Sequence, residues 1–194
     1  MRGFSLVDLT VTLSIAALLV GVGLPGMVDL VKEYQATRAI NNLVGQIQLA
    51  RSVAITQRTA VTLCPTGGVN WSNPDVAPRC GLRDSWHSGS MLFMDGNGNG
   101  RFEAEDRLVH LLPPMSGDGV IRWRAFRNRS GLTILASGLT DSQNGSFRYC
   151  PANSDVRFAR QAILNRQARV RHARDSDGDG VREAPNGKPL SCPP

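Results

Sequence analysis

The pattern of apolar and polar positions changes its period along the chain. Residues 9–28 form a run of twenty residues without a charge, long enough as a helix to cross a bilayer at about 1.5 Å per residue. Arg38, Gln46 and Arg51 belong to the next stretch, where they fall on faces other than the apolar one. The apolar positions there recur with the i, i+3, i+4 spacing of one helix face: Ile40, Leu43, Val44, Ile47, Ala50 and Ala54. The pattern predicts one helix from about Phe4 to Gln57.

Beyond Arg58 the helical period gives way to short apolar runs separated by Gly, Asn, Asp and Pro clusters, which is typical of antiparallel hairpins. In the run 120–126, strand alternation places Trp123 toward the core and Arg122 and Arg124 toward water. We therefore expect the aromatic residues of this run to pack inside the protein. The predicted strands are 60–64, 90–94, 107–112, 120–126, 132–135, 146–150, 159–165 and 168–172. The fold class is therefore α+β, a long helix followed by an antiparallel sheet.

The first residues do not form an ordinary secretory signal, because Met1-Arg2-Gly3 is almost no basic region and no small-residue cleavage site closes the apolar run. Asp8 lies at the edge of that run, where an unpaired charge is unfavourable. The segment 3–9, GFSLVDL, resembles the class III leader of type IV pilins and pseudopilins. A plain single-span membrane anchor is the alternative.

This resemblance implies that a prepilin peptidase cuts after Gly3 and methylates Phe4. It also implies that Asp8 pairs with the terminal amine of a neighbouring subunit during assembly, although the family usually has Glu, one methylene longer. Pro25 falls where these helices commonly carry a kinking proline. The implied organisation is a leader (1–3), a transmembrane and assembly half of the helix (4–28), an amphipathic half (29–57) and a β-rich domain with a basic C-terminal region (58–194).

The resemblance extends to about Cys192. Residues 50–52 (ARS) with Ala54, residues 61–65 (VTLCP), Trp86 followed by Gly89, and residues 93–95 (FMD) resemble the FimT and GspH group of minor pilins. This group implies a type IV pilin-like fold, with the helix, transmembrane in its first half, packed on the sheet domain. It also implies a single pass through the inner membrane before assembly, a pilus at the cell surface afterwards, and other pilins as partners.

The four cysteines should be oxidised in a domain exported beyond the inner membrane. Three connectivities are possible, and no C-x-x-C spacing favours zinc. Closeness in sequence favours Cys64–Cys80 and Cys150–Cys192, and the second pair also matches the C-terminal disulfide of the group.

Two acidic loops have oxygen-bearing side chains at alternate positions. The first places Asp95, Asn97, Asn99 and Asp106 at loop positions 1, 3, 5 and 12, which partly meets the needs of calcium. The second repeats the first half with Asp175, Asp177 and Asp179 but has Asn186 in the twelfth place. Such runs are also ordinary hairpin turns. We therefore expect no cofactor, with calcium as the alternative.

No catalytic motif accompanies the three histidines, His87, His110 and His172: the chain lacks a nucleophile elbow, a phosphate loop and a metal-protease motif. We expect no enzyme and no small-molecule substrate.

Positive charge is concentrated near the C-terminus. The chain has 22 Lys+Arg, of which only Lys32 and Lys188 are lysines, and its net charge is +6. Residues 157–174 contain six arginines and no acidic residue. On a strand, Arg169 and Arg171 point to one face, and Arg166 before the turn can reach the same face. Such a ridge suits the phosphates of nucleic acid, and a solvated strand edge is the alternative.

In FimT-type minor pilins a C-terminal Arg followed by a G-R-x-R element binds DNA for natural transformation. Arg166, Arg169 and Arg171 match its arginines in spacing, while Ala168 replaces the family Gly. The resemblance implies binding of double-stranded DNA, and Arg160 and Arg174 are additional candidates. The sequence shows no groove-reading helix or RNA-binding signature, so we expect binding that is independent of sequence and dependent on salt. Residues 122–129 offer an auxiliary phosphate contact. The rival function is a structural minor pilin or a type II secretion pseudopilin without DNA binding.

Overall fold

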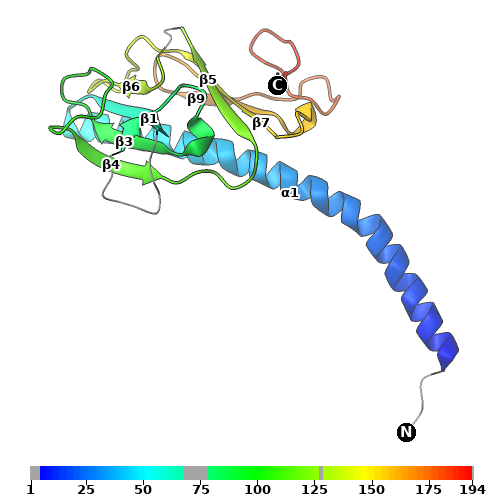
Figure 1. Ribbon diagram of the computed structural model, residues 1–194. Coiled ribbons are helices and arrows are strands. Elements are labelled where there is room, and N and C mark those ends of the chain that lie inside the picture. The colour runs from blue at the N-terminus through cyan, green and yellow to red at the C-terminus, as the bar shows by residue number, and fades with distance from the viewer. Residues whose placement is uncertain (1–4, 68–77, 127–128, 194) are drawn as a thin grey trace. The chain divides into compact units, whose positions relative to one another are not determined.

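The computed structural model describes residues 5–67, 78–126 and 129–193. The processing residues Gly3 and Phe4 lie outside the described residues. The chain divides into two units, Met1–Tyr34 and Gln35–Pro194. The helix α1 (Leu6–Gln57) runs through both units (Figure 1), which confirms the single long helix expected from the sequence.

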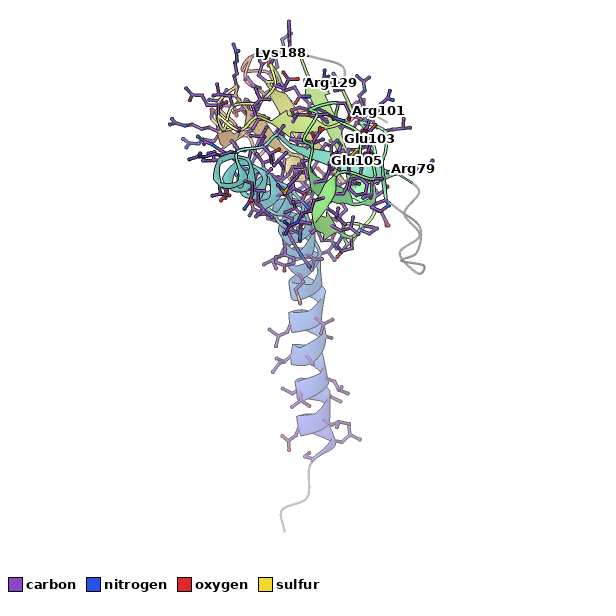
Figure 2. All side chains as sticks on the ribbon, turned by 90° about the vertical axis from the view of Figure 1, so that its left-hand side faces the viewer. Arg79, Arg101, Glu103, Glu105, Arg129 and Lys188 are labelled. Carbon is purple, nitrogen blue, oxygen red and sulfur yellow. A yellow bond between two sulfur atoms is a disulfide. The ribbon has the colours of Figure 1, made fainter. Side chains whose placement is uncertain are left out.

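The first unit consists of the apolar part of α1. Its large hydrophobic side chains are exposed, and they stand out from the helix (Figure 2). By length and composition this helix can cross a membrane. Asp8 lies in the first turn, where its carboxylate accepts a hydrogen bond from the Ser5 N–H at 3.3 Å and is favourably placed against the helix dipole. The helix continues through residue 25 without a break.

The second unit contains two antiparallel sheets (Figure 1). The first sheet consists of β1 (Val61–Gly67), β2 (Arg79–Cys80), β3 (Ser90–Met94), β4 (Arg107–Leu112) and β6 (Leu132–Ile134). Its strands are in the order β2-β1-β3-β4, with β6 also pairing with β1. The second sheet consists of β5 (Val120–Ala125), β7 (Gly145–Cys150), β8 (Arg160–Leu164) and β9 (Val170–His172), in the order β5-β7-β8-β9. The short 3-10 helices η1 (Trp86–Ser88) and η2 (Val156–Phe158) precede β3 and β8.

The core of the second unit lies between the helix and the sheets. Aromatic rings from the second sheet and η1 form its centre: Trp123 stacks on Phe147 at 4.1 Å, and Trp86 meets Phe147 edge-on at 4.7 Å. The helix contributes a buried stripe in which small alanines permit close approach: Ala36, Ile40, Leu43, Ile47, Ala50 and Ala54. The helix face and the inward direction of Trp123 are both confirmed.

Three features differ from the sequence-based expectation. The strands form two sheets instead of one, and the two-residue strand β2 was not predicted. Phe126, expected to pack at the end of a strand, lies beyond β5 and is 82% exposed. Gln46, assigned to a polar helix face, is buried and its Oε1 accepts a hydrogen bond from the Ser90 hydroxyl at 2.7 Å.

Candidate nucleic-acid interface

The hairpin between β8 and β9 is organised by one asparagine. The Asn165 Oδ1 atom accepts hydrogen bonds from the N–H groups of Gln167 and Arg169, both at 3.0 Å. The main chain adds a bond from the Ala168 N–H to the Asn165 carbonyl at 3.0 Å and one from the Asn165 N–H to the Arg169 carbonyl at 3.1 Å. These four bonds fix the backbone that carries Arg166 and Arg169.

Ala168 has the backbone conformation for which the family Gly is suited. Its φ angle is 55°, in the left-handed region where a Cβ atom costs roughly 1–2 kcal/mol. Its methyl group is 4% exposed and belongs to the main hydrophobic cluster. The turn therefore retains the left-handed conformation with Ala, at the cost of local strain that burial of the methyl group partly offsets.

The three arginines of the expected DNA site lie on this hairpin and are all exposed. Arg171 is paired in register with Ile163, whose strand neighbours Ala162 and Leu164 are in the core, so Arg171 points to the outer face of the sheet. Arg169, two residues earlier, is on the same side. Within the described part of the chain, Arg166, Arg169 and Arg171 form no ion pair with a carboxylate. Their charges are available to an external anion.

The two additional candidates for the DNA site, Arg160 and Arg174, differ in their exposure to solvent. Arg160 is a correction to the expected site: it is only 6% exposed, and its Nη1 atom donates to the carbonyls of Arg157 and Ala159 at 3.0 and 2.8 Å. Its position opposite the buried Tyr149 in the sheet explains the burial. Arg174 is exposed and lines an open groove of about 1060 Å³ together with Arg171.

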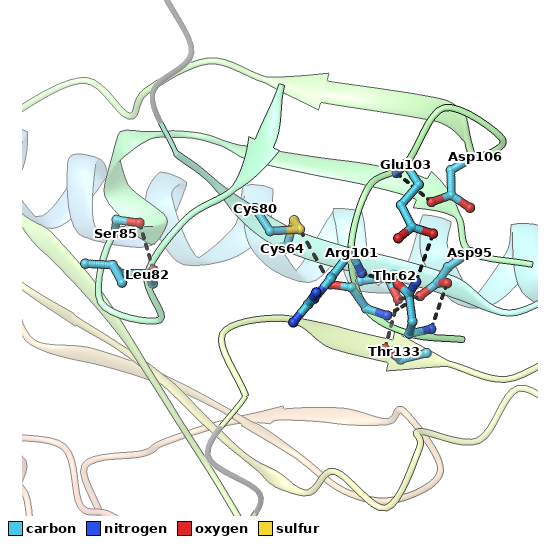
Figure 3. Close-up of a disulfide and its surroundings, with 12 residues drawn as sticks. Thr62, Cys64, Cys80, Leu82, Ser85, Asp95, Arg101, Glu103, Asp106 and Thr133 are labelled. Carbon is cyan, nitrogen blue, oxygen red and sulfur yellow. Dashed lines mark hydrogen bonds between the residues drawn. A yellow bond between two sulfur atoms is a disulfide. The ribbon is translucent and has the colours of Figure 1, made fainter. Parts of the chain in front are cut away.

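The first acidic loop is closed by its own hydrogen bonds (Figure 3). The buried Asp95 carboxylate accepts from the Thr62 hydroxyl at 2.7 Å and from the N–H groups of Asn99 and Gly100 at 3.1 and 2.9 Å. The side-chain amides of Asn97 and Asn99 donate to Glu103, and the Asp106 carboxylate accepts from the Glu103 N–H. These contacts give the Asp and Asn residues a structural role in the turn.

The second acidic loop brings four carboxylates together. Oxygens of Asp175, Asp177, Asp179 and Glu183 all lie within 4.8 Å of one another. Oxygen ligands of this kind could hold a hard divalent cation. The loop pattern places Asn186 at the closing position, whereas the structure brings Glu183, at the ninth loop position, to the three aspartates. In the structure these carboxylates also accept hydrogen bonds from main-chain N–H groups of the loop.

Two disulfides close the second unit, Cys64–Cys80 and Cys150–Cys192, and this is the expected pairing. The second bond holds the C-terminal tail against the second sheet. There the Arg122 Nη1 atom donates to the Pro193 carbonyl and the Arg148 Nη1 atom donates to the Ser191 carbonyl, both at 2.9 Å. The tail therefore orients two guanidinium groups.

The histidines are dispersed over separate elements, with His87 in η1, His110 in β4 and His172 in β9. Burial, together with the nearby Arg122 charge, lowers the pKa of His87 below its usual 6.5. Burial raises the pKa of Tyr149, and the charge of Arg160 opposes this change. Among the described residues, these groups suit structural roles in the core and at the sheet edges.

A long apolar helix whose second half packs on antiparallel sheets defines the type IV pilin fold. Residues 39–175 match the family model described as type II transport protein GspH, and the chain belongs to this family. Pilins and pseudopilins are structural proteins. A comparison with curated proteins gives no significant match.

Among solved structures, the chain is similar to the type IV minor pilin FimU of Pseudomonas aeruginosa (strain PAO1) in space group P21. The identity is 18% and the TM-score is 0.54, with 82% of this chain and 96% of that chain covered. The same protein in space group P65 has 18% identity and a TM-score of 0.46, with 70% and 90% covered. At this identity the likeness concerns the fold.

Proposed function

We propose that this chain is a type IV minor pilin that binds extracellular double-stranded DNA through Arg166, Arg169 and Arg171, for uptake in natural transformation. The observation that carries the proposal is the β8–β9 hairpin: its backbone is fixed by Asn165, and its three arginines are exposed and form no ion pair with any carboxylate that the structure describes. Guanidinium groups bind phosphate oxygens through paired N–H donors. Since the hairpin presents no groove-reading helix, the contacts are to the backbone and independent of sequence.

The apolar helix supports a life cycle that begins in the inner membrane. After cleavage at Gly3 by a prepilin peptidase and methylation of Phe4, the chain joins a pilus with other pilins, and Asp8 pairs with the terminal amine of a neighbour. The exposed apolar surface of residues 6–21 suits first lipid and then the helices of neighbouring subunits. Pilus retraction then brings the bound DNA toward the periplasm.

Duplex DNA binding by the full-length protein in non-ionic detergent tests the hairpin. The variant R166Q/R169Q/R171Q should lose most of its affinity. The variant R79Q/R101Q/R107Q is the matched control, because it removes the same charge from exposed arginines of the first sheet and its flanking loop (Arg79 and Arg101 are labelled in Figure 2). Equal losses in the two variants would reduce the effect to net charge and contradict the proposal.

The second candidate is a structural minor pilin or a type II secretion pseudopilin without DNA binding. The description of the matching family, type II transport protein GspH, favours it. Under this alternative the hairpin arginines only keep the edge strand β9 from pairing with other chains. Wild-type protein that fails to bind DNA at low salt would establish this alternative over the first.

A further inference from the structure

The outer face of the second sheet carries a second group of arginines, distinct from the hairpin. Arg122 and Arg124 lie on β5, and Arg148 lies on β7. The intervening and opposite residues Trp123 and Phe147 are buried in the core, so strand alternation directs all three arginines outward. We call Arg124 and Arg148 the β5–β7 arginine group, and Arg122 is their neighbour on the same face.

The strand register connects this group with the hairpin. Arg124 is paired with Ser146, Ser146 with Ile163, and Ile163 with Arg171, so one row of side chains crosses the sheet from edge to edge. Neighbouring strands lie about 4.8 Å apart, which places the backbones of Arg124 and Arg171 roughly 14 Å from each other. That separation is close to the width of the B-DNA major groove, about 12 Å, across which phosphates of the two strands face each other.

The close approach of like charges on β5 and β7 is unfavourable for the isolated domain. Arg122 and Arg148 are direct cross-strand partners, and like charges opposite each other destabilise a sheet. Burial and the neighbouring Arg124 lower the pKa of Arg148. No acidic residue stands in the described strand pairs of this row or of the next one. The nearest acidic side chains at the hairpin end are Asp177 and Glu183, which line the groove beside Arg171. Asp84, beside the group, already pairs with Arg83 at 3.8 Å.

The tail contacts keep this positive charge in place. The Ser191 carbonyl accepts a hydrogen bond from Arg148, and the Pro193 carbonyl accepts one from Arg122. Carbonyl oxygens carry no net charge, and a guanidinium group has five N–H donors, so Arg148 retains donors for another acceptor. The disulfide Cys150–Cys192 anchors the tail and so fixes the two side chains. The oriented Arg148 guanidinium group and the exposed one of Arg124 are complementary to a polyanion.

We infer that the β5–β7 arginine group is a second phosphate-binding site, and that duplex DNA lies across the strands of the second sheet between this group and the hairpin. The inference rests on the proposed function, since it extends the same DNA-binding surface. Arg124 and Arg148 provide phosphate contacts on one side of a groove, and Arg171 provides one on the other. Because the contacts are to the backbone, every duplex sequence is bound alike.

The test is the salt dependence of duplex binding by the full-length protein in non-ionic detergent. Each lost phosphate contact flattens the log–log slope by about 0.9, so R124Q/R148Q should flatten it by roughly 1.8. The control R79Q/R101Q, with the same charge removed from the other sheet, should leave the slope within experimental error. Because Arg148 also holds the tail, R124Q alone is measured too and should flatten the slope by about 0.9, with an unchanged melting temperature.

The outcomes separate the two proposals. Wild-type slopes for R124Q and R124Q/R148Q, together with loss of binding in the hairpin variant, would overturn this inference and leave the proposed function standing. Aggregation of R124Q/R148Q with an unchanged slope would also overturn it and assign the arginines to protection of the edge strand β5. Loss confined to R124Q/R148Q would overturn both the hairpin as the site and the placement of DNA across the sheet, and would leave only the β5–β7 arginine group as the phosphate site. Wild-type protein that binds no DNA would overturn both.

Discussion

Asn165 offers a way to separate the geometry of the hairpin from its charge. Its Oδ1 atom accepts the N–H groups of Gln167 and Arg169, both at 3.0 Å. In Asn165→Ala both bonds are lost while the arginines keep their charge. In Asn165→Asp a carboxylate oxygen can accept the same two bonds, but a negative charge enters the hairpin. Asn165→Ala therefore changes the hydrogen bonds of the hairpin, and Asn165→Asp changes its charge.

The size of each effect follows from the contacts. A hydrogen bond contributes about 0.5–1.5 kcal/mol net, and Asn165 is exposed to water, so Asn165→Ala should lower the free energy of unfolding by about 1–2 kcal/mol. For a domain of this size that is a fall in melting temperature of roughly 2–8 °C. In Asn165→Asp, a carboxylate about 7 Å from a bound phosphate costs roughly 0.6 kcal/mol in water, or about threefold in affinity for each such phosphate.

Thermal unfolding and fluorescence anisotropy with a labelled duplex measure the two effects. Asn165→Ala should melt earlier and bind DNA within about threefold of wild type, because its charges are intact. Asn165→Asp should melt close to wild type and bind several-fold more weakly, with the difference shrinking as salt screens the charges. An Asn165→Asp protein that binds as tightly as wild type would refute the placement of phosphates at this hairpin. An unchanged melting temperature in Asn165→Ala would refute the role of the side chain in fixing the turn.

Three other predictions concern stability. Ala168→Gly should change the free energy of unfolding by less than about 1 kcal/mol. Relief of backbone strain, about 1–2 kcal/mol, is offset by the lost burial of the methyl group, about 0.8 kcal/mol, and by the added freedom of the unfolded chain, about 0.4–1 kcal/mol. A loss of about 2 kcal/mol or more in urea unfolding would show that Ala168 is unstrained. Replacing Cys150 and Cys192 with Ser should cost about 2–4 kcal/mol, since the bond closes a separation of 42 residues, and a stability equal to wild type would contradict this. Because the pKa of His87 is lowered in the folded protein, the unfolded chain binds more protons, and stability falls as the pH drops below 6.5. In His87→Gln the fall in stability between about pH 7 and pH 5 should be smaller. A pH profile of stability identical to that of the wild type would disprove the lowered pKa of His87.

The periodicity of the sequence was sufficient for the main elements. The helix face from Ile40 to Ala54 follows from a local pattern, because burial of one face determines the spacing of its apolar residues. The strands β3 and β4 follow from short apolar runs bounded by turn residues. The division into two sheets does not follow from these patterns. It depends on which strands pair, and β1 pairs with β2, β3 and β6 through contacts distant in sequence.

Buried polar residues account for most of the remaining differences. Gln46 is buried because Ser90, 44 residues away, supplies a hydrogen bond to it. Arg160 is buried because main-chain carbonyls and the facing Tyr149 surround it, so an arginine count overestimates the exposed charge. Glu183 joins the acidic loop only through the fold of the C-terminal segment. In each case a partner distant in sequence, or the path of the folded chain, determines the position, and no local pattern records it.

The slope of the logarithm of the DNA association constant against the logarithm of salt concentration tests the central claim most directly. It is measured for wild type and for the variant with Arg166, Arg169 and Arg171 replaced by Gln. Three phosphate contacts predict that the slope of the variant is flatter by roughly 2.7. Equal slopes for the two proteins would mean that the hairpin makes no phosphate contact, and would contradict the proposal that it is the DNA-binding site.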